Sequence, residues 1–173
     1  GDAEATAAVG DARVRLDGDL AYAAGGDDVA VRVGASGLHP DVLARAIPQI
    51  SLPGELTVPL DASVRTRVGL DGRIGDVSAR LDGGAGTLRW PERYDEPLPI
   101  RDLTVGADYE RGADRLTVDT LALTLGTGDG PGPRVSGEAT VANLLSGAMT
   151  VETAVTARNV RMARLGRYWP KGA

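Results

Sequence analysis

The sequence predicts an all-β protein dominated by a long antiparallel, strongly curved sheet that forms an open groove, with one or two short helices. Apolar and polar residues alternate along most of the chain, the pattern of strands with one dry and one wet face. Short turns rich in Asp and Gly separate these stretches, and short connections join antiparallel strands. In residues 56–70 the alternation continues without interruption, which predicts one strand of roughly 50 Å at about 3.3 Å per residue. So long a strand suits a wide, curved sheet.

The first third of the chain predicts a hairpin followed by a helix. Residues 13–22 place Val14, Leu16, Leu20 and Tyr22 on one face, and a Gly-Gly-Asp-Asp turn leads to a second strand at residues 29–33. Residues 36–41 read Ser-Gly-Leu-His-Pro-Asp, a typical helix start, before an apolar stripe over residues 42–47. A short amphipathic helix is therefore expected here.

The rest of the chain predicts further strands at residues 74–81, 87–90, 103–109, 116–125, 135–141 and 151–157, and a helical turn at 161–168. Two of these strands change the phase of their apolar residues, between Ile74 and Val77 and between Val118 and Leu121. The first change indicates either a β-bulge or a strand that begins only after Gly75, and in the second case we expect a bulge near Asp119 or Thr120. About eight strands in one domain, residues 1–173, are predicted.

Composition excludes several classes of function. The chain carries a net charge of -5, whereas a nucleic-acid-binding surface needs clustered positive charge. It contains no Cys, so it has no disulfide and no thiolate chemistry. Because it shows neither a long apolar run nor a leader, we expect an internal segment of a longer protein. Hydrophobic residues make up 42% of the chain but aromatic ones only 3%, which favours an aliphatic core.

No catalytic or metal-binding constellation is visible, so we expect no enzyme and no cofactor. His39 is the sole histidine and is interpreted as a capping or surface residue. The acids at positions 17, 19, 27 and 28 lack the spacing of a calcium loop, and the glycine-rich stretches 82–86 and 126–132 do not open helices as phosphate-binding loops do.

The order of several motifs resembles the central region of AsmA-like proteins of the YhdP type, most clearly over residues 36–170. The motifs are His-Pro-Asp at 39–41, Leu-Pro-Gly-Glu-Leu at 52–56, Leu-Asp-Gly at 70–72, Gly-Gly-Ala-Gly-Thr-Leu at 83–88, Leu-Pro-Ile at 98–100 and Leu-Gly-Arg-Tyr-Trp-Pro at 165–170. The resemblance implies a segment of a Gram-negative envelope protein, anchored in the inner membrane and extending through the periplasm. Such proteins form a curved β-groove thought to conduct phospholipids between the two membranes.

Two functions follow as alternatives. In the first, phospholipid acyl chains lie along a concave aliphatic face lined by Leu56, Val58, Leu60, Val64, Val68, Leu70, Leu103, Val105, Leu121 and Leu123. In the second, the same face is closed as an ordinary core, as in many antiparallel sheets. The chain would then be a structural module of the envelope whose sheet edges pair with neighbouring segments of the same longer protein.

Overall fold

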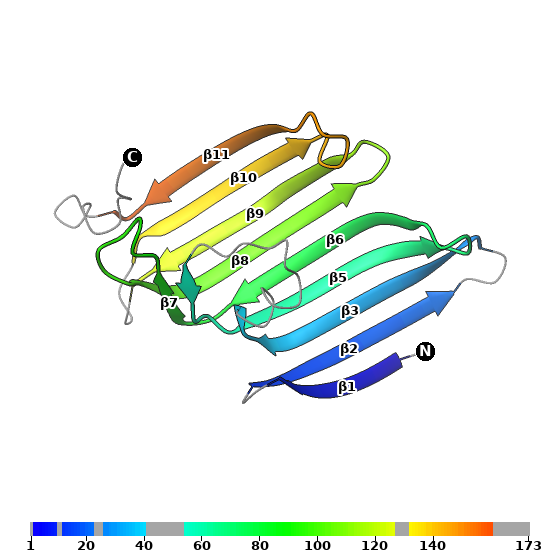
Figure 1. Ribbon diagram of the computed structural model, residues 1–173, viewed down its shortest axis with the longest axis horizontal. Coiled ribbons are helices and arrows are strands. Elements are labelled where there is room, and N and C mark those ends of the chain that lie inside the picture. Colours follow the sequence, from blue (N-terminus) through cyan, green and yellow to red (C-terminus); the bar gives the residue numbers. More distant parts are fainter. Residues whose placement is uncertain (1, 10–11, 23–25, 41–53, 127–131, 161–173) are drawn as a thin grey trace.

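The chain folds into a single open antiparallel sheet (Figure 1). The computed structural model describes residues 2–9, 12–22, 26–40, 54–126 and 132–160, with side chains from Val14 onward. Its strands are β1 (Asp2–Val9), β2 (Ala12–Tyr22), β3 (Asp28–Leu38), β4 (Glu55–Leu56), β5 (Leu60–Gly69), β6 (Ile74–Gly83), β7 (Gly86–Arg89), β8 (Leu98–Glu110), β9 (Arg115–Leu125), β10 (Arg134–Ala142) and β11 (Thr150–Arg158). The expected helical turn at 161–168 lies outside these ranges, and so does the expected helix after its first residue, Pro40.

The strands follow one another across the sheet in the order β1-β2-β3-β5-β6-β8-β9-β10-β11. The short strand β4 pairs only with β7, and β7 also pairs with the first residues of β8. Every pairing is antiparallel, as the short connections predict. The outer strands β1 and β11 lie at opposite edges and do not pair with each other, so the sheet is open (Figure 1).

Bulges are present at both phase changes. The register between β5 and β6 shifts where Thr66 pairs with Val77 but Val68 pairs with Ile74. The register of β9 shifts against both of its neighbours around Asp119. At each shift the extra residues restore the apolar side chains of both strand halves to the same face.

The predicted fifteen-residue strand is wrong in one respect: it is broken at residues 57–59 into β4 and β5. Pro59 has no N–H to contribute to a ladder. The segment instead pairs with the stretch around β7, where the Thr57 N–H donates to the Thr87 carbonyl at 2.9 Å and the Gly84 N–H to the Pro59 carbonyl at 3.2 Å. The break buries the Val58 side chain completely, with 0% exposed.

Two features of the first strands differ from the expectation. Ser36–Leu38, which lead into the expected helix, continue β3 through a bulge: Gly37 adopts a φ of 72°, and its N–H donates to the Asp61 carboxylate at 2.9 Å. Pro40, the expected first helical residue, is helical, and the rest of that helix lies outside the described residues. Strand β1 was not expected, because four of its eight residues are Ala, which is depleted in strands. Pairing with β2 over its whole length overrides this weak propensity.

The core lies at one end of the sheet, which we call the core end. Here the buried side chains form one cluster: Val14, Leu38, Val58, Leu60, Ile100 and Leu125. Leu56 of β4 and Leu88 of β7 pack against this cluster. The opposite end, where the turns β2–β3, β5–β6, β8–β9 and β10–β11 lie, we call the open end (Figure 1).

Gly86 leaves room at the core end for residues 57–59, which pass close over its backbone and which we call the crossing segment. A Cβ at this position would lie 2.8 Å from both Cα and N of Val58, closer than real Cβ atoms approach. We expect Gly86→Ala to lower the free energy of unfolding by about 1–3 kcal/mol, because a backbone segment has to shift. Gly84→Ala is the matched control, since its Cβ would meet only Pro59 at 3.7 Å. Equal urea denaturation midpoints for the two variants would contradict this account.

Asp114 organises the turns of the open end. Its carboxylate accepts hydrogen bonds from the N–H groups of Leu145 and Ser146, the Ser146 hydroxyl and the Tyr109 hydroxyl. Burial raises the pKa of Asp114, but these hydrogen bonds together outweigh it and hold the pKa below the ordinary 3.8. The turn between β10 and β11 is thereby fixed to the turn between β8 and β9.

A lowered pKa makes the contribution of Asp114 to stability depend on pH. The contribution is fully present above the ordinary pKa of 3.8 and is lost as the pH falls through the lower pKa of the folded state. Asp114→Asn tolerates the positive φ of 45° but lacks the charge. We expect the variant to be less stable than the wild type at pH 6, with the difference shrinking as the pH falls below about 4. A difference in melting temperature that is constant from pH 6 to pH 3 would contradict this role.

Candidate functional site: an open aliphatic face

The register places the apolar side chains in continuous rows across the sheet. Residues that pair directly share a face, so each row can be followed from strand to strand. One row toward the open end runs through Leu20, Val31, Thr66, Val77, Tyr109, Leu116, Val141 and Val151. The next two rows run through Val33, Val64, Ala79, Ala107, Val118 and Ala139, and through Leu16, Ala35, Ala62, Leu81, Val105, Leu121 and Val155. Together they form what we call the aliphatic face.

The aliphatic face is buried at the core end and becomes exposed toward the open end. The row that contains Leu38 and Leu60 belongs to the core cluster. Farther along, Val64 is 39% exposed, its register partner Val33 46%, and Leu20 56%. A sheet closed on itself or roofed by a second layer would bury these side chains. Leaving large aliphatic groups in water costs on the order of 1.5–3 kcal/mol each, so a cluster of exposed ones beside half-buried neighbours in the same rows marks a surface that binds something.

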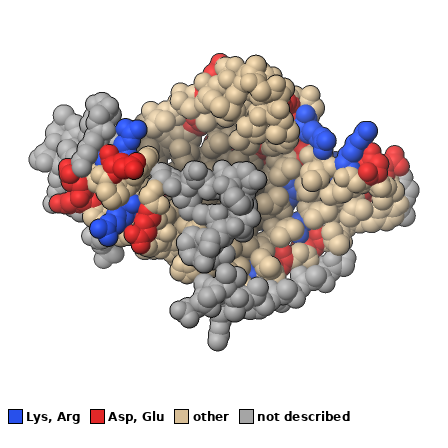
Figure 2. Space-filling model, viewed as in Figure 1, with Lys and Arg blue, Asp and Glu red and all other residues tan. Residues whose placement is uncertain are grey.

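Figure 2 shows this face from the same side as Figure 1, where β7 lies in front of the sheet. The surface over β8–β11 is formed almost entirely by uncharged residues, and most Lys, Arg, Asp and Glu side chains in view gather at the left and right margins. The part of the face over β8–β11 therefore offers contact with apolar groups and little charge to direct a polar ligand.

The residues predicted to line a lipid path lie in different environments. Leu56, Val58 and Leu60 belong to the core or pack against it. Val64, Val68, Val105 and Leu121 lie in or beside the exposed rows, and Leu103 pairs with Leu123 at the margin of the core. Leu70 lies in the exposed turn after β5. The prediction missed Leu20, Val31, Val33 and Leu81, although the same alternation in β2, β3 and β6 could have identified them.

The opposite face, which we call the polar face, carries the charged side chains of the same strands. Arg80 of β6 donates two hydrogen bonds to the Asp82 carboxylate, at 2.7 and 3.0 Å, and Thr104 donates a third at 3.1 Å. The hydrogen bond from Arg80 is the main reason that the pKa of Asp82 lies below its ordinary value of 3.8. Shallow cavities of about 560, 370, 220 and 210 Å³ open between side chains of this face.

The sequence motifs considered for chemistry occupy ordinary positions. His39 is exposed between β3 and the buried Pro40. Among the residues that the structure describes, no group of three or more His, Cys, Asp or Glu side chains could hold a metal ion. Trp90 and Tyr94 make an edge-to-face contact with ring centroids 6.3 Å apart in the connection before β8, away from the exposed rows.

Within the same described ranges, no helix has the length and apolar character needed to cross a membrane. Comparison with known proteins returned no matching family model, no matching curated protein and no matching solved structure.

Proposed function

We propose that this chain is a lipid-conduit segment, in which acyl chains of phospholipids lie on the aliphatic face. The observation that carries the proposal is the set of exposed aliphatic side chains around Val33 and Val64, on a sheet that is not closed. Aliphatic side chains offer smooth, non-directional contact, which suits alkyl chains better than sugars or bases. The uncharged surface over β8–β11 agrees with an apolar ligand.

Transport of an acyl chain along such a surface requires no catalytic step. An acyl chain that slides from one row of Val, Leu and Ala side chains to the next exchanges similar contacts, so no position holds it strongly. The aliphatic side chains become more exposed from the core end toward the open end, so an acyl chain could enter the path at the open end. Together with the resemblance to AsmA-like proteins, this leads us to propose a periplasmic location within a longer protein that is anchored in the inner membrane and carries phospholipids to the outer membrane.

The direct test is to purify the protein from bacterial cells and analyse it by native and denaturing lipid mass spectrometry. The proposal expects phospholipids to co-purify and to be displaced by an added fatty acid. Protein that carries no lipid, and that takes up no fluorescent fatty acid on titration, would refute it.

A second candidate function, a structural module of the envelope, is favoured by one observation. Edge strand β11 is exposed at every residue, keeps an unbroken register with β10 over nine pairs, and contains neither Pro nor Lys. Such an edge can accept another strand. A neighbouring segment of the same longer protein would extend the sheet there, which is compatible with a conduit as well. Without lipid binding, this pairing alone would be the function.

A further inference from the structure

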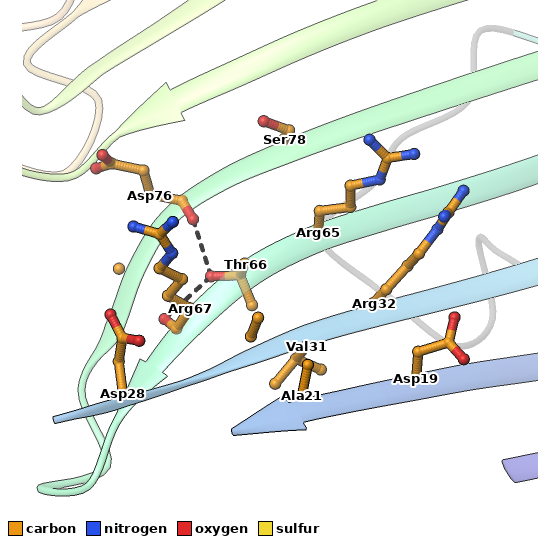
Figure 3. A pocket seen from close by; sticks show the side chains of 12 residues that line it. Asp19, Ala21, Asp28, Val31, Arg32, Arg65, Thr66, Arg67, Asp76 and Ser78 are labelled. Carbon is orange, nitrogen blue, oxygen red and sulfur yellow. Dashed lines mark hydrogen bonds between the residues drawn. The ribbon is translucent and has the colours of Figure 1, made fainter. Parts of the chain in front are cut away.

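The largest of the cavities on the polar face lies between strands β2, β3, β5 and β6, and its volume is about 560 Å³. Charged side chains of both signs line it, as Figure 3 shows: Asp19, Asp28, Arg32, Arg65, Arg67 and Asp76. Because the cavity lies on the polar face, acyl chains bound to the aliphatic face would not occupy it.

Two of the arginines oppose each other directly in the sheet. Arg32 of β3 and Arg65 of β5 are register partners. The Cβ atoms of such a pair are about 4.5–5.5 Å apart, and like charges at this position destabilise the sheet. Figure 3 shows both side chains extending in the same direction, with the guanidinium groups at their ends. Two neighbouring forks of N–H donors are therefore presented together.

Neither guanidinium is neutralised within the described part of the chain. The ion pairs found there join Arg73 to Asp71, Arg80 to Asp82 and Arg101 to Asp102, and no hydrogen bond engages the Arg32 or Arg65 side chain. Asp19 is the register partner of Arg32 on its other side, yet its carboxylate forms no ion pair within 4.0 Å. By contrast, the nearby Arg80 on the same face donates two hydrogen bonds to the Asp82 carboxylate.

We propose that Arg32 and Arg65 bind the phosphate group of a small phosphorylated ligand in this cavity. Guanidinium groups bind phosphate oxygens in bidentate geometry, and an anion between the two would convert their repulsion into attraction. The carboxylates of Asp19, Asp28 and Asp76 can accept hydrogen bonds from hydroxyl or ammonium groups of the same ligand. Because none of the described residues that line the cavity is aromatic, a phosphorylated polyol or a phosphoethanolamine-type group fits better than a nucleotide.

For this site we expect linked effects of substitutions on thermal stability and on phosphate binding. Replacing one member of the pair with the similarly long, neutral glutamine removes the repulsion and the phosphate contact together. Arg65→Gln and Arg32→Gln should therefore be at least as thermostable as the wild type without phosphate, but should lose the stabilisation that phosphate gives. A purely structural role for these arginines would lower stability in both conditions.

Arg134 and Arg158 provide the matched control. They are also register partners, on β10 and β11, but they line none of the four cavities described above. We would titrate the wild type, Arg32→Gln, Arg65→Gln and Arg134→Gln with inorganic phosphate, glycerol phosphate and glycerophosphoethanolamine at constant ionic strength, and follow binding by calorimetry and melting temperature. The constant ionic strength separates site binding from general screening.

We expect phosphate ligands to raise the melting temperature of the wild type and of Arg134→Gln equally, and the affinity of the Arg32 and Arg65 variants to fall at least tenfold. Tighter binding of glycerophosphoethanolamine than of glycerol phosphate would identify a lipid headgroup as the source, and the reverse order a free phosphorylated polyol. The proposal is overturned if the wild type shows no stabilisation, or if Arg134→Gln loses affinity as much as the other two variants.

Discussion

Val58→Glu is expected to unfold the core end of the sheet. Val58 lies in the segment 57–59, and its completely buried side chain belongs to the core cluster with Leu38, Leu60 and the other core residues. A carboxylate at this site would be buried without a partner, and an uncompensated buried charge costs about 3–5 kcal/mol. Since domains of this kind are stable by only about 5–15 kcal/mol, much of the folded population would be lost.

Urea denaturation followed by circular dichroism measures this effect. The segment at residues 57–59 is held by pairing with residues 84–87, so the loss of Val58 packing should also release these hydrogen bonds, including the one from the Thr57 N–H to Thr87. Amide hydrogen exchange at Thr57 and Gly84 should then accelerate more than exchange in β9 or β10. A denaturation midpoint equal to that of the wild type would show that Val58 does not hold this end together.

Most strands other than β1 could be predicted from the sequence, because each depends on an alternation that adjacent strands reinforce. The bulge at Asp119 is an example: the phase change between Val118 and Leu121 makes sense only if both halves of β9 contact the same core. By contrast, the break at residues 57–59 does not disturb the alternation, because Leu56, Val58 and Leu60 all remain on the apolar side. The break is signalled only by Pro59 and by Gly86, which is distant in the sequence. Because Val58 and Gly86 meet only in the folded protein, alternation along one strand cannot reveal this contact.

The same reasoning explains which parts of the candidate sites escaped prediction. Alternation identifies which residues share a face, but whether Val64 is covered depends on the presence of a second layer. The Arg32–Arg65 pair depends on the register between β3 and β5, which a bulge between Ala35 and Leu38 sets. A shift of one residue would separate the two arginines onto opposite faces. The sequence of β3 or of β5 taken alone therefore does not predict that Arg32 and Arg65 lie opposite each other.

Val64→Glu is expected to leave the fold intact while abolishing acyl-chain binding. Val64 occupies the same face of the sheet as Val58, but it is 39% exposed, with Val33 and Ala79 as its exposed register partners. A carboxylate there can keep its hydration, so the free energy of unfolding should change by no more than about 1 kcal/mol. An acyl chain crossing this row would have to remove water from the charge. We therefore expect the affinity for a fluorescent fatty acid to fall at least tenfold, equivalent to about 1.4 kcal/mol.

Ser63→Glu is the matched control for this prediction. It introduces the same side chain at the next position of β5, on the polar face and opposite Arg80, so fatty acid binding should match the wild type. The three variants then separate the possible environments of one face: Val58→Glu tests a closed core, Val64→Glu an open apolar surface, and Ser63→Glu the charge alone. If Val64→Glu unfolds the protein as Val58→Glu does, the face is closed around Val64. If it folds and still binds the fatty acid with wild-type affinity, acyl chains do not cross this row and the conduit is not where we propose it.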